Sequence, residues 1–267
     1  MTGLSRIQGV LAAIVGIFLL LPLIAVIPVS FTPKRFLSMP GGEWSLRHYQ
    51  TLLTQPEWAQ SLLLSLKVGF MAALFATTLG LMFSLGIWMT RPRYSGVLVG
   101  LALLPMVAPP VVSALTLYFF LNRLGQWNDV IAYDTWLGVS IAHAVMIVPF
   151  AIVVIMVSLS QVDRRIDLAA RAMGAGLWDR IRHVILPNIK FGIGSAFFLS
   201  FVLSWEEIGV TLFITSVQTI TLPRRMWMGL RDNIDPAIAA ISVVLILLAC
   251  LVVAIRTFLQ WRAGKRR

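Results

Sequence analysis

Six long runs of mainly apolar residues constrain the fold of this chain more than any other feature. The runs comprise residues 7–31, 62–89, 96–121, 136–158, 188–215 and 236–260. Each is long enough to cross a bilayer, for which a helix needs about 20 such residues. Only 12% of the residues are charged, against about 25% in a soluble domain. The sequence therefore predicts an all-α integral membrane protein with six transmembrane helices, in which residues 1–267 form a single transmembrane domain.

The distribution of Lys and Arg between the runs predicts the orientation of the chain, because cytoplasmic loops are enriched in basic residues. Fourteen of the 22 basic residues lie at the two ends of the chain and in residues 90–95 and 159–190. Seven lie in the alternate segments, and Lys67 lies inside a run. This bias predicts that both termini and residues 159–190 are cytoplasmic. It also accounts for the net charge of +11 without a nucleic-acid partner.

Residues 32–60 form a long segment on the predicted external side. Pro40, Gly41 and Gly42 predict a turn. The apolar side chains that follow at helical spacing are Trp44, Leu46, Tyr49 and Leu53. Such side chains accumulate at membrane surfaces, so the pattern favours an interfacial helix that anchors the chain, with direct substrate contact as the alternative.

Within residues 159–190, apolar positions recur at the spacing of one helix face. They are Ile166, Ala169, Ala170, Met173 and Leu177. The charged residues that fall off this face are Arg164, Arg165, Asp167 and Arg171. Gly174 then predicts a sharp change of direction, and Pro187 predicts the start of the next helix. A short surface helix, a bend and a new membrane helix form an arrangement that can dock in a groove of another subunit.

This segment resembles the cytoplasmic "EAA" loop of permease subunits of bacterial binding-protein-dependent, ATP-driven importers. The family pattern is Glu-Ala-Ala, three residues, Gly, nine residues and Ile-x-Leu-Pro. The residues that match in register are Ala169, Ala170, Gly174, Leu186 and Pro187. Leu168 occupies the acidic position, with Asp167 one residue earlier, and Val184 replaces Ile. The difference bears on any salt bridge of the family's Glu but not on the predicted shape.

The resemblance implies a type I ABC importer permease (MetI-like) fold in a bacterial inner membrane. It implies that residues 159–190 couple the chain to an ATPase through Asp167, Leu168, Ala169, Ala170, Arg171 and Gly174. The implied partners are an ATP-binding subunit that holds ATP and Mg, a second and non-identical permease, and a periplasmic substrate-binding protein. The sequence contains no Walker A motif and no metal-ligand or catalytic cluster, so we expect this chain to bind no cofactor itself.

Two adjacent carboxylates, Glu206 and Glu207, follow Trp205 inside the fifth run. A carboxylate in the hydrocarbon region is costly and usually faces a cavity or a partner. On a helix the two side chains would point about 100° apart, so one can face a pathway while the other faces a helix cap or a partner. We therefore predict a substrate pathway at Trp205, Glu206 and Glu207. A kink or a subunit contact with a paired charge is the alternative.

Pro105 and the pair Pro109-Pro110 interrupt the third run. Proline removes a backbone hydrogen bond and bends a helix, and broken backbone at membrane depth is tolerated where it is buried or lines a cavity. The third run is therefore predicted to be a kinked helix that either lines the pathway or serves packing. His143 in the fourth run is predicted to hydrogen-bond a neighbouring helix in preference to binding a ligand.

The surroundings of the two carboxylates resemble the second permease of spermidine/putrescine-type importers. The residues that carry this resemblance are 204–213, Leu222-Pro223 and 235–240. It implies a small, amine-bearing, polyamine-like substrate, which an intramembrane carboxylate also favours. The alternatives are an amino acid, an opine or an organic acid, because relatives with such acids carry other solutes. An integral membrane enzyme would need a catalytic set that the sequence lacks, and a stand-alone channel or secondary transporter would not need the docking segment.

Overall fold

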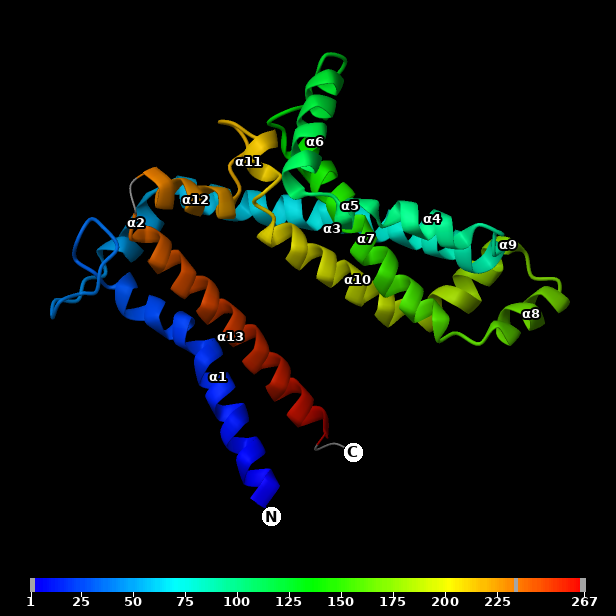
Figure 1. The fold of residues 1–267 in the computed structure, drawn as a ribbon, viewed down its shortest axis with the longest axis horizontal. Helices are drawn as coiled ribbons and strands as arrows, with labels where there is room; N and C mark the ends of the chain where they lie inside the picture. Colours follow the sequence, from blue (N-terminus) through cyan, green and yellow to red (C-terminus); the bar gives the residue numbers. More distant parts are fainter. Residues whose placement is uncertain (1–2, 233–234, 265–267) are drawn as a thin grey trace. The chain divides into compact units, whose positions relative to one another are not determined.

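The computed structural model describes residues 3–232 and 235–264, and every regular element within them is a helix (Figure 1). The chain divides into two compact units, Met1–Gln60 with Arg225–Arg267, and Ser61–Arg224. Among the described residues, five helices are long and apolar enough to cross a membrane. Their ranges are Ile7–Ser30, Pro56–Thr90, Trp136–Ser160, Leu177–Glu206 and Ala237–Phe258. Each of these five helices overlaps one of the six predicted spans.

The first unit is built from α1 (Gly3–Ser30), α13 (Ala237–Gly264) and the short helix α2 (Arg47–Thr54). Helices α1 and α13 lie side by side (Figure 1), and α2 packs against α13. Gly41 and Gly42 have φ of +60° and +101° and form the predicted turn. The interfacial helix is shorter than predicted, since Trp44 and Leu46 precede it. The amphipathic helix α12 (Leu222–Asp232) precedes α13 in the chain.

The second unit contains three long helices, the broken third run and the predicted docking segment. The long helices are α3 (Pro56–Thr90), α7 (Trp136–Ser160) and α10 (Leu186–Glu206). Helices α7 and α10 pack along one another. One buried cluster comprises Leu85, Trp88, Ala151, Ile155, Leu159, Ile185, Ile189 and Ala196, from α3, α7 and the helix that ends in α10. This packing places the ends of the three helices next to the docking segment.

Gly192 allows the close approach of α10 to α7, because a Cβ at this position would overlap the Ser158 side chain. We expect Gly192→Ala to force the helices apart and to destabilise the protein by about 1–3 kcal/mol. The matched control is Gly194→Ala on the same helix, where the added Cβ would meet no atom within 4 Å apart from the adjoining residues and backbone of its own helix. Thermal unfolding of the purified transporter measures both variants, and equal melting temperatures would contradict the close contact.

The third run is not one kinked helix, as the sequence predicted, but three separate helices. They are α4 (Ser95–Ala102), α5 (Leu104–Val107) and α6 (Pro110–Gly125). Ala108 and Pro109 between α5 and α6 are extended, with ψ of 137° and 130°. Each of these two residues precedes a proline, which disfavours the helical conformation. The paired prolines therefore end the helix completely, whereas Pro149 lies within the uninterrupted α7.

The fifth run also differs from its predicted limits at both ends. Pro187 does not open the helix, because helical structure already begins at Leu177 as α9 (Leu177–Asp179) and continues through a π-helical turn, Arg180–Ile185, into α10. Helix α10 then ends at Glu206, and α11 (Thr211–Ile214) follows after a non-helical link. Glu206 and Glu207 therefore do not lie on one continuous helix. Helix α11 packs against α6, so the two broken regions meet.

Candidate functional site

The predicted docking segment folds as a short capped helix, α8 (Arg164–Ala172), followed by a sharp bend. The Asp163 carboxylate accepts a hydrogen bond from the Arg165 N–H at 2.9 Å and caps the start of the helix. Gly174 has φ of +83° and ends it. The Ala175 N–H donates to the carbonyl of Ala170 at 3.0 Å, which is the bond pattern of a glycine-terminated helix. The bend predicted at Gly174 is therefore present.

Asp167 holds α8 onto the helix that follows the bend. The Arg180 Nε donates to Asp167 Oδ1 at 2.7 Å, its Nη2 donates to Oδ2 at 3.0 Å, and the Arg171 Nε donates to Oδ2 at 3.1 Å. These bonds from Arg180 hold the pKa of Asp167 below its ordinary value, although burial raises it. Asp167 lies off the predicted apolar stripe of the helix, and its pairing with Arg180 makes it one of the buried residues of α8.

The opposite side of α8 and the following turn expose apolar side chains. Met173 is 82% exposed, and Leu168 and Leu177 are each about three-fifths exposed. Trp178, which the sequence analysis did not single out, is also exposed. Ala169 is exposed with them, while Ala170 faces the buried side. Exposed apolar side chains gathered on one element mark an interaction surface.

The predicted pathway residues separate in the structure, and only Glu207 of the three lines a described cavity. That cavity has a volume of about 360 Å³. Its other lining residues are 105–110, Met146, Ile147, Phe150 and Leu203. The Glu207 carboxylate is half-buried and accepts a hydrogen bond from the Val210 N–H at 2.8 Å. Glu206 is exposed, and Trp205 packs its ring against Phe201. The cavity therefore combines the proline-broken third run with the carboxylate at the break of the fifth.

His143 connects the two sides of the break after α10. Its Nδ1 lies 2.9 Å from Ser204 Oγ at the end of α10, and its Nε2 lies 2.8 Å from Thr211 Oγ1 at the start of α11. The Thr211 hydroxyl donates its hydrogen to the Glu207 carbonyl, so Nε2 carries the imidazole proton and Nδ1 accepts from Ser204. The predicted hydrogen bond of His143 to a neighbouring helix is confirmed, and it fixes the backbone that carries Glu207.

Asp134 organises the loop after α11 and was missed by the sequence analysis. Its carboxylate accepts hydrogen bonds from the N–H groups of Val217 and Gln218 at 2.9 Å and of Thr219 at 3.0 Å. Burial raises the pKa of Asp134, but these backbone donors together hold it below its ordinary value. No local pattern connects Asp134 with a loop more than 80 positions later, so only the fold reveals the pairing.

Comparison with known proteins places the chain among transport proteins. Residues 77–265 match a family described as binding-protein-dependent transport system inner membrane component. The spermidine/putrescine transport system permease protein PotC of Haemophilus influenzae is 26% identical, with 91% of each chain covered. The molybdenum transport system permease protein ModB of Escherichia coli K12 is 34% identical over 66% of this chain and 81% of its own. The sulfate transport system permease protein CysT of the same organism is 28% identical over 99% and 95%.

Two solved structures share the fold. A bacterial ABC transporter involved in the import of the acidic polysaccharide alginate aligns with a TM-score of 0.71 at 15% identity, covering 97% of this chain and 95% of its own. An amino acid ABC transporter aligns with a TM-score of 0.53 at 20% identity, covering 78% and 96%.

Proposed function

Because the chain belongs to the family of binding-protein-dependent transport system inner membrane components, we propose which of its surfaces couples to ATP hydrolysis and which class of substrate it carries. The chain is a multi-pass permease subunit of an ABC importer, and the family implies a complex with an ATPase and a binding protein. It is a transport subunit and not itself an enzyme. Cytoplasmic termini and a second, non-identical permease belong to the proposal.

We propose that α8 and the bend after it dock on the ATPase subunit, which holds ATP and Mg. The predicted coupling residues are Asp167, Leu168, Ala169, Ala170, Arg171 and Gly174. The exposed apolar side chains Leu168 and Met173 support this role, since a neighbouring subunit would bury them. Within the set, Asp167 and Ala170 hold the helix from its buried side, and Gly174 sets the bend.

Crosslinking tests this surface. We expect a cysteine at exposed Ala169 to crosslink to the ATPase in the assembled transporter, after Cys250 has been replaced by Ser. The matched control is a cysteine at the adjacent Ala170, which is only 3% exposed and faces the other side of the helix. Crosslinks are detected by mass spectrometry with and without ATP. An active complex that gives no crosslink from position 169 would remove the assignment.

For the substrate, we propose a small cation that bears amino groups, such as a polyamine. The observation that carries this is the half-buried Glu207 carboxylate in the cavity lined by residues 105–110. An intramembrane carboxylate needs water or a counter-charge, and a substrate ammonium group supplies one. Glu206 and Trp205 do not line this cavity.

The second candidate is a small substrate without an amino group, such as an organic acid or another anion. The permeases ModB and CysT, whose names refer to molybdenum and sulfate transport, favour this candidate. The chain is 34% and 28% identical to them, compared with 26% to PotC. The two candidates differ in the charge that Glu207 would meet, so the effect of removing its charge separates them.

A further inference from the structure

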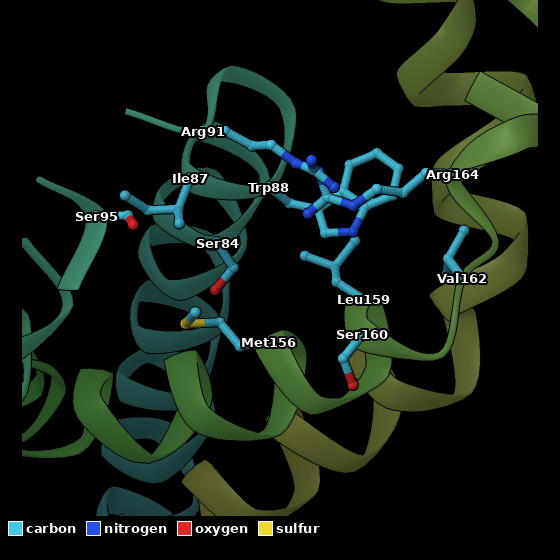
Figure 2. Close-up of a pocket in the computed structure, with 10 residues that line it drawn as sticks. All are labelled: Ser84, Ile87, Trp88, Arg91, Ser95, Met156, Leu159, Ser160, Val162 and Arg164. Atoms are coloured by element: carbon cyan, nitrogen blue, oxygen red, sulfur yellow. The ribbon is translucent and has the colours of Figure 1, made fainter. Parts of the chain in front are cut away.

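A second cavity, of about 560 Å³, lies where the ends of α3, α4 and α7 meet the start of α8. Figure 2 shows its lining residues, which are Ser84, Ile87, Trp88, Arg91, Ser95, Met156, Leu159, Ser160, Val162 and Arg164. Neither the pathway nor the exposed face of α8 uses these residues. The cavity is on the side of the chain that the orientation proposed above places in the cytoplasm.

The charged groups of this cavity are two guanidinium groups. The Arg164 guanidinium carbon lies 5.0 Å from the centre of the Trp88 ring, and Arg91 reaches toward the same ring in Figure 2. Within the part of the chain that the structure describes, no carboxylate oxygen lies within 4.0 Å of either group. A smaller cavity of about 260 Å³ shares Trp88, Arg91 and Arg164. That smaller cavity is also lined by Asp167 and Arg171, whereas in the larger cavity the two arginines are the charged lining residues.

A buried polar group independently indicates a ligand. Ser84 is fully buried, its hydroxyl has no hydrogen-bond partner among the described residues, and it lines the cavity. In Figure 2 the hydroxyl points toward the Met156 side of the cavity. A serine inside a helix can bond the carbonyl of the preceding turn, as Ser158 does here. An unused buried hydroxyl needs an explanation, and a ligand with an acceptor oxygen provides one.

The remaining lining distinguishes the kind of ligand. Ile87, Met156 and Leu159 give the cavity an apolar side opposite the arginines. Guanidinium groups bind phosphate through paired charge-assisted hydrogen bonds. A free inorganic anion would use the arginines but has no part that fits the apolar surfaces.

We propose that this cavity binds a phosphate group, and that its source is the headgroup of an anionic phospholipid from the cytoplasmic leaflet. Arg91 and Arg164 hold the phosphate oxygens, Ser84 donates its free hydroxyl to an ester oxygen of the lipid, and the acyl chains begin along the apolar side formed by Ile87, Met156 and Leu159. Basic pockets between transmembrane helices on the cytoplasmic side are suited to such headgroups. Because Arg164 opens α8, a bound lipid ties the docking segment to the bilayer. The proposal is independent of which substrate the importer carries.

The test measures lipid retention by the full permease–ATPase complex. The complex is placed in nanodiscs of phosphatidylcholine with a minority of phosphatidylglycerol, released, and examined by native mass spectrometry. We expect the variant Arg91→Asn with Arg164→Gln to retain at least about tenfold less phosphatidylglycerol than the wild type. Asn is chosen at position 91 because Arg91 has φ of +48°, which Asn tolerates. The matched control, Arg93→Asn with Arg165→Gln, removes the same charge from exposed side chains that do not line the cavity, and it should retain the lipid.

A Ser84→Ala variant and a competition with free anions complete the test. Ser84→Ala, which leaves the charges and the packing in place, should lower retention severalfold, and it carries the test if the double variant does not assemble. Inorganic phosphate or sulfate at about 10 mM should not displace the lipid, although this concentration is far above the dissociation constant of a specific anion site. Equal retention by the cavity and control variants would overturn the proposal. Displacement by either free anion would show a soluble-anion site in place of a lipid site.

Discussion

Uptake of a cationic substrate is expected to fall at least tenfold in Glu207→Gln, while assembly and basal ATP hydrolysis are preserved. The Gln side chain keeps an acceptor oxygen for the Val210 N–H, which now bonds Glu207 Oε1 at 2.8 Å. The variant therefore removes the charge from the cavity but leaves the turn after α10 intact. A hydrogen bond to a charged group contributes about 1.5–3 kcal/mol, which corresponds to a tenfold or larger change. The measurement is uptake of labelled putrescine or spermidine into vesicles that contain the complete transporter, with its binding protein outside.

Glu206→Gln is the matched control, because Glu206 is adjacent in the chain, carries the same charge and does not line the cavity. We expect a smaller loss of uptake from it. Poor assembly of Glu207→Gln would indicate that the carboxylate serves the backbone and not the substrate. Transport of a cationic substrate at the wild-type rate by both variants would exclude a substrate role for the acids. Sulfate, molybdate and small organic acids would then be tested in the same vesicles.

The helical membrane fold follows from the sequence, but the breaks in the helices do so only in part. Run length and hydropathy, which depend on composition alone, correctly predict where five membrane-spanning helices lie, although not every helix end. The proline pair in the sequence marks the break at Ala108 and Pro109. The same pair is compatible with a kinked helix and with a complete end of the helix, so it does not distinguish them. The break at Glu207 has no proline, so an uninterrupted helix was the natural prediction. Packing against α6 and the His143 bonds decide it, and both depend on distant residues.

Local geometry of the docking segment was predictable, whereas its attachment was not. Asp163 caps the start of α8 and Gly174 ends it, and each does so through residues close to it in the chain. Rules for helix capping and for glycine-terminated helices therefore apply to both ends. Helix periodicity places Asp167 off the apolar stripe of α8, but it does not show that the side chain is buried. Its partner, Arg180, lies beyond the bend, and no spacing rule extends across a change of direction. Asp134 shows the same limit, because its partners lie in the loop after α11, more than 80 positions later in the chain.

The Asp167–Arg180 pair leads to the second large expected effect. Asp167→Asn should uncouple ATP hydrolysis from transport, because it removes the charge that holds α8 against the helix leading into α10. Both side chains are about nine-tenths buried, and breaking a buried pair by removing one partner costs about 3–5 kcal/mol, since the other charge stays buried. The matched control is Asp179→Asn in the same segment, whose carboxylate is 64% exposed. Uptake and ATP hydrolysis are measured together in vesicles, and the wild-type ratio in Asp167→Asn would contradict the role of the pair.

The pH dependence of the same contact gives a second readout with a defined sign. The pKa of Asp167 lies below its ordinary value, chiefly because of the hydrogen bonds from Arg180. The pair therefore contributes its full stabilisation above the ordinary carboxyl pKa of about 3.9, and the contribution is lost only as the pH falls toward the lowered value. Coupling in the wild type should consequently not vary between about pH 5 and 8 through this group.

Removing both charges with Asp167→Asn and Arg180→Gln should recover part of the stability lost in Asp167→Asn, because no uncompensated charge is left buried. Thermal unfolding of the two variants measures this recovery, and a double variant no more stable than Asp167→Asn would show that α8 is held by its packing and not by the pair.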